Sequence, residues 1–529
     1  MPVTPTFPGV YIDEVASAVH TITGVPTAVA AFVGSAPRGP TDAPVHITSF
    51  ADYQRIFGGV QATSPLSYAV YQFYLNGGSE AEIVRVVRTG DTTATNNAVT
   101  ATVALKSGAA KTVTLAARGE GTWASPTAET ALRIRVDYDT SGGTNTYNLA
   151  VFDPTTRVVV ERFRNIVADA NDPNSLDRAL GGSALFTVAS GVDVNLRPDA
   201  HAAVSTAKPD PWADDEPTRW TAATGGQDGI APIGTDYLGG TNGQADKKGI
   251  YQLLKTDIFT IMCLPGAPES LTTDAATLCQ TRRAMLILDP PAAWSSVATA
   301  VSGMATPPLT LALGRNAAVY FPNVTIADPA AGGGPRTVPP CGTMAGVWAR
   351  TDVQRGVWKA PAGTEASLNG VSSLTVPMSD LENGRLNPLG VNCLRSFPVV
   401  GPVAWGARTL AGADRLGDQW KYLPVRRLAL FLEESLYRGT QWAVFEPNDE
   451  PLWAAIRLNV GAFMNTLFRQ GAFQGATARE AYLVKCDREN NPQADIDRGI
   501  LNIVVGFAPL KPAEFVIIHI EQLAGQLQV

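Results

Sequence analysis

The sequence Pro-Ala-Glu-Phe-Val-Ile-Ile-His-Ile-Glu occupies residues 512–521, close to the end of a chain of 529 residues. Residues 515–520 are apolar at nearly every position, which is typical of a strand that is covered on both faces or lies in the middle of a sheet. Chain ends usually fray unless something holds them, and an apolar strand with a free edge recruits other chains. Two hypotheses follow: the strand completes the sheet of its own domain, or it is donated to the sheet of a neighbouring copy. A terminal strand most often closes its own sheet, so the residues alone favour the first.

The opposite end of the chain is also predicted to be extended. Three prolines within the first eight residues prevent a helix there, and residues 10–15, Val-Tyr-Ile-Asp-Glu-Val, predict a short strand. We therefore expect an N-terminal arm over residues 1–20 and a C-terminal strand or arm over residues 512–529. An arm at one end and a strand at the other are what an intermolecular sheet needs, although many single domains have them as well.

Composition and charge exclude several classes of protein. Hydrophobic residues make up 45% of the chain and charged residues 17%, which supplies a large buried core. The net charge is −7 with no basic block, so we expect no direct nucleic-acid partner. No apolar run is long enough to span a bilayer, and Asp13 and Glu14 stand where a signal peptide would be apolar. The 5 cysteines are far apart, which indicates reduced thiols in a protein made in the cytoplasm.

Strand and helix patterns alternate in two separated parts of the chain and predict one α/β core domain over residues 21–89 and 226–385. Expected strands lie at 27–34, 82–88, 258–264, 284–288 and 317–326, and expected helices at 49–57, 64–75, 269–282 and 293–304. Such alternation predicts a mixed, partly parallel sheet with flanking helices. Gly and Pro clusters indicate that residues 328–400 are rich in loops.

Between these two parts, residues 90–225 are rich in Thr, Ala, Asp and Gly and contain short alternating strands. Residues 132–138 and 147–151 predict a hairpin through the turn at 141–144. We expect a separate, mostly β domain inserted into the core domain.

The last part of the chain, residues 386–511, is expected to form a further domain. Residues 425–438 and 451–470 have apolar positions at helical spacing, and strands are expected at 481–486 and 500–508. The fold class is therefore α/β (α+β mixed) and multidomain, with a core sheet, an inserted β-rich domain and extended arms at both ends.

Residues that carry chemistry are sparse. The 4 histidines are scattered, and no spacing matches a zinc site, a phosphate-binding loop, a dinucleotide fingerprint or a nucleophile elbow. We predict no catalytic, metal-binding or cofactor-binding residues, no cofactor, and no enzyme activity. The tryptophans of the last third indicate core packing or, alternatively, an assembly interface.

Several motifs make the chain recognisable when they are taken together. They are Pro-Gly-Val-Tyr-Ile-Asp-Glu-Val at 8–15, Asn-Pro-Leu-Gly-Val-Asn at 387–392, Val-Ala-Trp-Gly-Ala-Arg-Thr-Leu at 403–410, Phe-Glu-Pro-Asn at 445–448, and Gly-Phe-Ala-Pro-Leu-Lys-Pro-Ala-Glu-Phe-Val-Ile at 506–517. In these motifs the chain resembles the contractile tail sheath proteins of phage tails and phage-tail-like contractile injection systems. The resemblance covers roughly residues 1–90 and 230–529, and residues 90–225 match no motif of the family.

The resemblance implies a structural subunit that polymerises helically around an inner tube and contracts from a metastable extended state to drive that tube through a target envelope. Implied partners are copies of the chain itself, the inner tube protein, and baseplate and terminal cap proteins, with no insertion into a membrane. Assembly in the bacterial cytoplasm as part of a contractile particle is expected. An injection system is favoured over the sheath of a contractile phage virion. A soluble α/β enzyme with an inserted β domain, binding a ligand at a strand-end crevice, is the alternative from another class.

The resemblance also raises the donated-strand hypothesis above the hypothesis of a strand that closes its own sheet. In the family the N-terminal arm and the C-terminal strand join the sheets of neighbouring subunits. The residues expected in this strand exchange are Val10, Tyr11, Ile12, Asp13, Glu14, Val15, Phe515, Val516, Ile517, Ile518, His519 and Ile520. The C-terminal domain is implied to face the tube, and the candidate tube contacts are Arg426, Arg427, Arg457 and Arg469.

Overall fold

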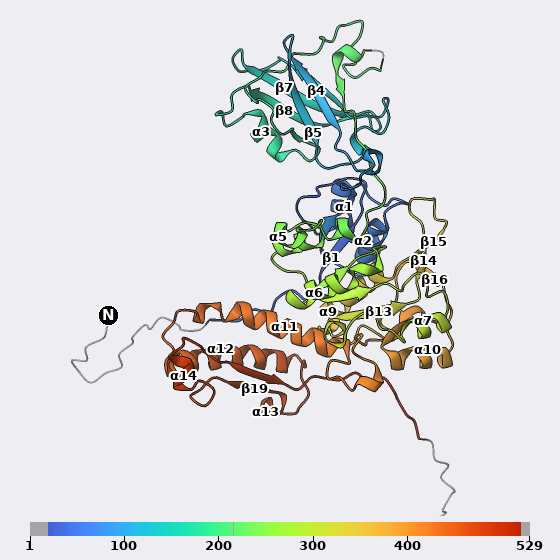
Figure 1. The fold of residues 1–529 in the computed structure, drawn as a ribbon, viewed down its shortest axis with the longest axis vertical. Helices are drawn as coiled ribbons and strands as arrows, with labels where there is room; N and C mark the ends of the chain where they lie inside the picture. Colours follow the sequence, from blue (N-terminus) through green and yellow to red (C-terminus); the bar gives the residue numbers. More distant parts are fainter. Residues whose placement is uncertain (1–19, 215, 520–529) are drawn as a thin grey trace, which may run out of the picture.

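The computed structural model describes residues 20–214 and 216–519 (Figure 1). Three parts follow one another along the long axis of the molecule: the inserted β domain at one end, the core domain in the middle, and a helical C-terminal domain at the other end. No helix of the described residues combines the length and the apolarity needed to cross a membrane.

The core domain is built on an eight-stranded sheet with the strand order β18-β17-β13-β12-β11-β1-β3-β2. Its strands are β1 (Val29–Gly34), β2 (Val45–Ile47), β3 (Glu80–Arg85), β11 (Ile261–Cys263), β12 (Met285–Leu288), β13 (Ala317–Phe321), β17 (Val391–Phe397) and β18 (Gly401–Ala404). Neighbouring strands from β17 to β3 are parallel, and an antiparallel strand closes each edge. The predicted mixed sheet is therefore confirmed. It also extends to residue 404, past the expected domain boundary at 385/386.

Helices cover both faces of this sheet and bury two hydrophobic clusters. The helices of the core domain are α1 (Phe50–Phe57), α2 (Pro65–Leu75), α4 (Gly234–Tyr237), α5 (Gly243–Asp246), α6 (Thr272–Thr281), α7 (Val297–Gly303), α8 (Leu311–Gly314), α9 (Cys341–Arg355) and α10 (Asp380–Leu386). The start and end of α1 follow the local sequence signals: the Ser49 side chain accepts a hydrogen bond from the Asp52 backbone, and Gly58 ends the helix at φ 95°.

The expectation of one strand over residues 317–326 is wrong. The segment forms β13 and then β14 (Val324–Ala327), and β14 belongs to a three-stranded sheet with β15 (Pro335–Val338) and β16 (Val371–Leu374). Pro322 separates the two strands, and a proline has no backbone N–H to donate to a sheet.

The expectation that residues 328–400 are rich in loops misses the buried helix α9, together with β15, β16, α10 and β17. Trp348 of α9 is fully buried and donates its indole N–H to Tyr320 Oη at 3.0 Å. A Cβ added at Gly346 would lie 2.5 Å from the carbonyl oxygen of Phe73 in α2. A Cβ at Gly342, one of the residues that indicated a turn, would lie 2.2 Å from the Ala69 carbonyl oxygen, so this glycine instead allows two helix backbones to approach closely.

The inserted domain is a β sandwich. One sheet contains β4 (Thr102–Ser107), β5 (Lys111–Ala117) and β9 (Phe186–Val188), and the other contains β10 (Thr221–Ala222), β6 (Arg133–Asp137), β7 (Thr146–Asp153) and β8 (Val158–Val167). The short helix α3 (Leu176–Ala179) lies in the connection between β8 and β9. The two sheets share one hydrophobic cluster, which agrees with the predicted mostly β insertion.

The C-terminal domain combines two long helices with a hairpin. Its elements are α11 (Leu423–Gly439), α12 (Glu450–Arg469), α13 (Ala478–Ala481), α14 (Gln493–Ile496) and the strands β19 (Tyr482–Lys485) and β20 (Val504–Phe507). Helix α12 packs against β19, and their shared hydrophobic cluster includes Ile22 from the N-terminal segment. Both expected amphipathic helices are therefore present, each within two residues of its predicted bounds at both ends.

Candidate assembly site

The C-terminal segment leaves the hairpin after β20 and is held by one carboxylate. Glu514 accepts hydrogen bonds from Arg408 Nε at 2.7 Å and from Arg408 Nη2 at 2.6 Å. The Arg408 side chain is fully buried, whereas that of Glu514 is 15% exposed. A two-pronged guanidinium–carboxylate pair is among the strongest polar contacts in proteins, so Glu514 fixes the point from which the chain end departs.

The surroundings of Arg408 form a site built for this guanidinium. Its Nη1 also donates to the carbonyl oxygens of Asn387 at 2.9 Å and Gly412 at 3.2 Å, and to Asp414 Oδ1 at 2.9 Å. Burial lowers the pKa of Arg408, but the hydrogen bonds and charges of Glu514 and Asp414 outweigh burial and raise it. Arg408 lies within the sequence motif at 403–410, but its partner Glu514 was not predicted.

Beyond Glu514 the apolar residues are exposed. Phe515, Val516, Ile517 and Ile518 are 73%, 81%, 77% and 77% exposed. Residues 515–519, including His519, belong to no strand or helix. The described part of the segment therefore does not close a sheet of its own chain, contrary to the hypothesis that the residues alone favoured. Donation to a neighbour remains a prediction, and Ile520 together with Val10, Tyr11, Ile12, Asp13, Glu14 and Val15 lies outside the described residues.

The β19–β20 hairpin is a two-stranded sheet, so within the described residues each of its strands has only one sheet neighbour. Leu483 of β19 is 56% exposed and Val504 of β20 is 45% exposed. One face of this sheet packs against α12, with Val484, Val505 and Phe507 in the shared hydrophobic cluster. Its outer edges carry the backbone groups to which a further strand could add.

The N-terminal segment lies along α11 and starts at the far end of the C-terminal domain. The His20 ring stacks on Trp442 with the ring centroids 4.0 Å apart, and its backbone N–H donates to Asn459 Oδ1 at 3.1 Å. Further along, the Thr27 carbonyl accepts from Arg427 Nη2 at 3.0 Å. The described chain therefore begins near the end of α11 and the start of α12, and the C-terminal segment leaves from the opposite end of this helical layer (Figure 1).

The four candidate arginines have different surroundings. Arg427 is buried and forms a two-pronged ion pair with Asp352 at 2.8 and 2.6 Å, so the structure excludes it as a surface contact. Arg426 is largely buried beside Asn316 and Trp420. Arg457 pairs with Glu450 at 2.6 Å and remains about one-third exposed. Arg469 is exposed and has no ion-pair partner in the part of the chain that the structure describes. Arg457 and Arg469 therefore remain the accessible candidates.

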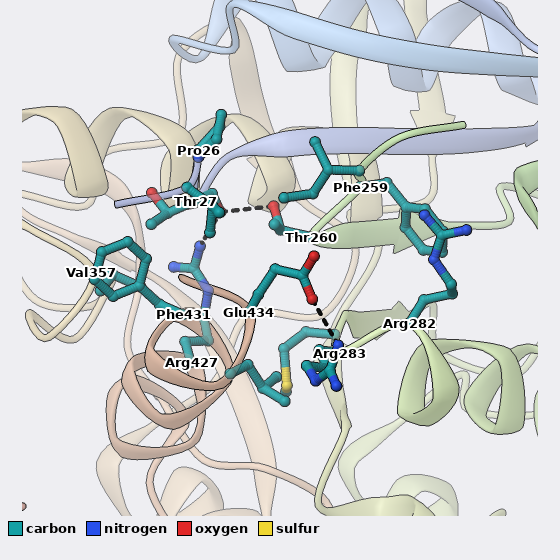
Figure 2. Close-up of a pocket in the computed structure, with 14 residues that line it drawn as sticks. Pro26, Thr27, Phe259, Thr260, Arg282, Arg283, Val357, Arg427, Phe431 and Glu434 are labelled. Atoms are coloured by element: carbon teal, nitrogen blue, oxygen red, sulfur yellow. Dashed lines mark hydrogen bonds and ion pairs between the residues drawn. The ribbon is translucent and has the colours of Figure 1, made fainter. Parts of the chain in front are cut away.

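Figure 2 shows the junction between the core domain and α11. The Thr260 hydroxyl donates to the Thr27 carbonyl at 2.8 Å, and Arg283 Nη1 donates to Glu434 at 2.8 Å. The cavity between these residues holds only about 20 Å³, which is room for about one water molecule. This pocket is a largely apolar joint between two domains, bridged by these two polar contacts, rather than a ligand site.

The enzyme alternative predicted a crevice at the carboxyl ends of the parallel strands. There the structure places Asp289, which follows β12 and accepts a hydrogen bond at 2.9 Å from the Cys341 backbone at the start of α9. Burial raises the pKa of Asp289 to about 7. The carboxyl group thus helps to begin a buried helix, because it accepts one of the N–H groups that have no partner within the helix.

Comparison with known proteins connects these features. The family model described as the phage tail sheath protein central domain matches residues 241–410, and that of the phage tail sheath C-terminal domain matches residues 417–522. The chain is 27% identical over 185 residues to the tail sheath protein of Vibrio phage KVP40, covering 35% of this chain and 26% of that relative. It is 24% identical over 288 residues to a putative prophage major tail sheath protein of Pseudomonas aeruginosa, covering 52% of this chain and 69% of that relative. The chain thus spans about a quarter of the length of the phage relative.

Solved structures agree in fold. The sheath of the extracellular contractile injection system PVC in its contracted state is similar with a TM-score of 0.57, 22% identity and 98% of both chains covered. The helical sheath of the anti-feeding prophage in its contracted state gives a TM-score of 0.55 at 22% identity, covering 98% of this chain and 100% of that chain. A sheath tail protein from Listeria innocua gives 0.59 at 14% identity, covering 93% of this chain and 97% of that chain. The mixed α/β multidomain fold is therefore shared along nearly the whole chain.

Proposed function

The chain belongs to the contractile tail sheath protein family, and from this premise we propose that it is the structural, non-catalytic subunit of a contractile sheath. Copies polymerise helically around an inner tube and contract from a metastable extended state, which drives the tube through a target envelope. The observation that carries the proposal is the exposed apolar end, Phe515–Ile518, which begins directly after a carboxylate fixed in a buried site. A lone subunit gains nothing from this arrangement, whereas a neighbouring copy can bind the exposed end as a strand.

The acceptor in this proposal is the β19–β20 hairpin of a neighbouring copy. A hairpin has two outer edges, and each chain has two ends with strand-forming sequences, residues 10–15 and 515–520. One arm pairing with each outer edge gives both strand-forming ends of the chain and both edges of the hairpin a hydrogen-bonding partner. The two ends depart from opposite ends of the C-terminal domain, so each subunit reaches different neighbours. Contacts between unlike surfaces that do not close on themselves build helical filaments.

Strand pairing between copies also suits a sheath that changes length. Main-chain hydrogen bonds depend little on side-chain identity, so the arms keep neighbours connected while the domains rotate and slide. The proposed partners besides the chain itself are the inner tube protein and the baseplate and terminal cap proteins. Assembly is proposed to take place in the bacterial cytoplasm, which fits the five buried, unpaired cysteines.

A phage-tail-like injection system is proposed in preference to a phage virion. The solved sheaths of the injection systems PVC and the anti-feeding prophage, each similar in fold along 98% of this chain, support this choice.

Two truncations test the strand exchange. One lacks residues 515–529 and ends at Glu514, which keeps the Arg408 contact; its matched control lacks residues 521–529 and keeps the apolar segment. We expect hollow cylinders from the full chain and from the control in negative-stain electron microscopy. The shorter chain should remain a folded monomer with an unchanged unfolding temperature. Cylinders from the shorter chain would contradict the strand exchange, and folded monomers from all three chains would contradict the sheath itself.

A further inference from the structure

A cavity of about 900 Å³ opens between the C-terminal segment and the core domain. Residues 510–515 form one side of it, Trp358 and Trp405 contribute aromatic surface, and Gln470 and Gly471 place it at the end of α12. Trp405 and Leu510 are each 37% exposed. The cavity therefore offers apolar surface that the lone subunit leaves in contact with water.

The loop between α11 and α12 projects apolar side chains into solvent. Phe445 is completely exposed, and its backbone lies in the left-handed region at φ 70°. The preceding Val444 is 62% exposed. An aromatic residue in this backbone conformation is strained, and such strain persists where it serves a function. We call residues 444–446 the knob, because they project an apolar side chain that contacts little of its own chain.

The charges of the knob and the cavity are complementary. Glu446 and Asp449 follow Phe445 in the loop and, within the described residues, form no ion pair; nor do Lys359 and Lys511, which line the cavity together with the ion-paired carboxylates Asp380 and Glu514. The other cations of the cavity wall are Arg355, which pairs with Glu365, and Arg395, which pairs with Asp380. An acidic loop and a cavity with unpaired lysines attract each other and disfavour contacts between two like surfaces.

The knob and the cavity lie at opposite ends of α12, so a contact between them joins copies head to tail. The knob lies directly before the start of α12 at Glu450, and the cavity lies directly after its end at Arg469. The helix has 20 residues and is therefore about 30 Å long. A subunit cannot place its own knob in its own cavity across this distance, but successive copies can join knob to cavity in an open series.

We propose that Phe445 of each subunit inserts into the Trp358–Trp405 cavity of a neighbouring subunit, with Glu446 and Asp449 beside Lys359 and Lys511. This contact rests on the proposed self-assembly and is additional to the strand exchange. It brings the knob end of one copy, where the N-terminal segment emerges beside Trp442, next to the exit of its neighbour's C-terminal segment. Both strand-forming ends then lie at the same junction between copies.

Cross-linking tests the contact directly. The native cysteines are all buried, so F445C and K359C can be made in separate chains, mixed, assembled and treated with a short bis-maleimide. We expect a cross-linked dimer from this mixture. The matched control pairs F445C with V158C, an exposed position in the inserted domain, and should give none. No dimer above the control, or cross-linking of K359C to Y11C instead of F445C, would overturn the proposal.

A second variant separates assembly from folding. F445G removes the knob and relieves the left-handed backbone, so its monomer should be at least as stable as the wild type. Loss of a buried Phe contact should raise the protein concentration needed for cylinders about 10- to 100-fold. The control V353A, at an exposed position outside the cavity lining, should assemble as the wild type does. If the wild type forms cylinders and F445G does so at the same concentration, this contact alone is overturned; if the wild type forms none, the proposed function fails with it.

Discussion

The eight-stranded sheet and the β19–β20 hairpin differ in their edge strands and in the burial of their apolar residues. Every residue of β1 and of β13 is buried, both faces of the large sheet are covered, and an antiparallel strand closes each edge. The hairpin has exposed apolar residues and no third strand within the described chain. One sheet is complete in a single subunit, and the other has free edges to which, in the proposed assembly, strands of neighbouring copies add.

This difference separates folding from assembly. Burial of apolar surface in the core domain stabilises the subunit by itself. One face of the hairpin packs on α12, but its outer edges and the exposed C-terminal segment contribute little to the stability of a monomer. In the proposed assembly they make the contacts between copies. Changes that disrupt core packing should therefore destabilise the fold, and changes at Glu514 or beyond should weaken assembly in a subunit that remains folded.

The largest effect on the monomer is expected from G346L in α9. Its added side chain would meet the backbone of α2 at the Phe73 carbonyl, where no flexible group can move aside. We expect a loss of about 3 kcal/mol or more in the free energy of unfolding, because overpacking a dense core forces backbone shifts. Urea denaturation of the chain that ends at Glu514 measures this without interference from assembly.

The matched control is G384A in α10, where an added Cβ meets nothing within 4 Å. Alanine is favoured over glycine in a helix by roughly 0.5–1 kcal/mol, so this variant should be slightly more stable. If G346L unfolded at the same urea concentration as G384A, the close approach of α9 to α2 would not be a determinant of the fold.

A smaller effect on folding, but a large one on assembly, is expected at the Arg408–Glu514 pair. R408M leaves Glu514 without its cation, whereas Asp414 keeps Lys421 at 2.7 Å; Glu514 reaches solvent, so the cost should fall below the roughly 3–5 kcal/mol typical of a broken buried pair. E514Q keeps the shape of the side chain, and Arg408 retains Asp414 and two carbonyls. We therefore expect E514Q to lower monomer stability by about 1 kcal/mol or less.

Both variants should release residues 510–514 and weaken assembly. Hydrogen exchange of this segment and sedimentation of the cylinders measure the two consequences separately. Wild-type protection of the segment together with normal cylinders in R408M would mean that the chain end is held by something other than Arg408.

Sequence patterns predicted the elements whose signals are local. Ser49 and Gly58 bound α1, and the 3.6-residue spacing of apolar residues predicted α11 and α12. The helix α9 was missed because Pro339, Pro340 and Gly342 are typical of turns, and only the backbone of α2 explains why glycine is needed there. The break at Pro322 was missed because residues on both sides of it favour strands.

Contacts between segments far apart in the sequence could not be predicted in the same way. The apolar run at 515–520 indicated a strand, but whether it pairs within its own chain depends on where Glu514 is fixed. That in turn depends on Arg408, which is 106 residues away. Similarly, Arg427 has the spacing of a surface residue on α11, and only the position of Asp352 shows that it is buried.

The smallest expected effect is a pH-dependent change in unfolding temperature that arises in the core domain and leaves the hairpin unaffected. Burial raises the pKa of Asp289 from 3.8 to about 7. A carboxyl group whose pKa is higher in the folded state binds its proton more tightly there, so the wild type loses stability as the pH rises from about 4 to about 7.

Asparagine at position 289 can still accept the hydrogen bond from Cys341 and does not titrate. We therefore expect the unfolding temperature of D289N to exceed that of the wild type by a few degrees at pH 8 and by less at pH 5. The exposed control D246N should show no such difference. An equal gain of D289N at both pH values would show that Asp289 does not titrate in this range, and cylinder formation through the hairpin should be the same in all three proteins.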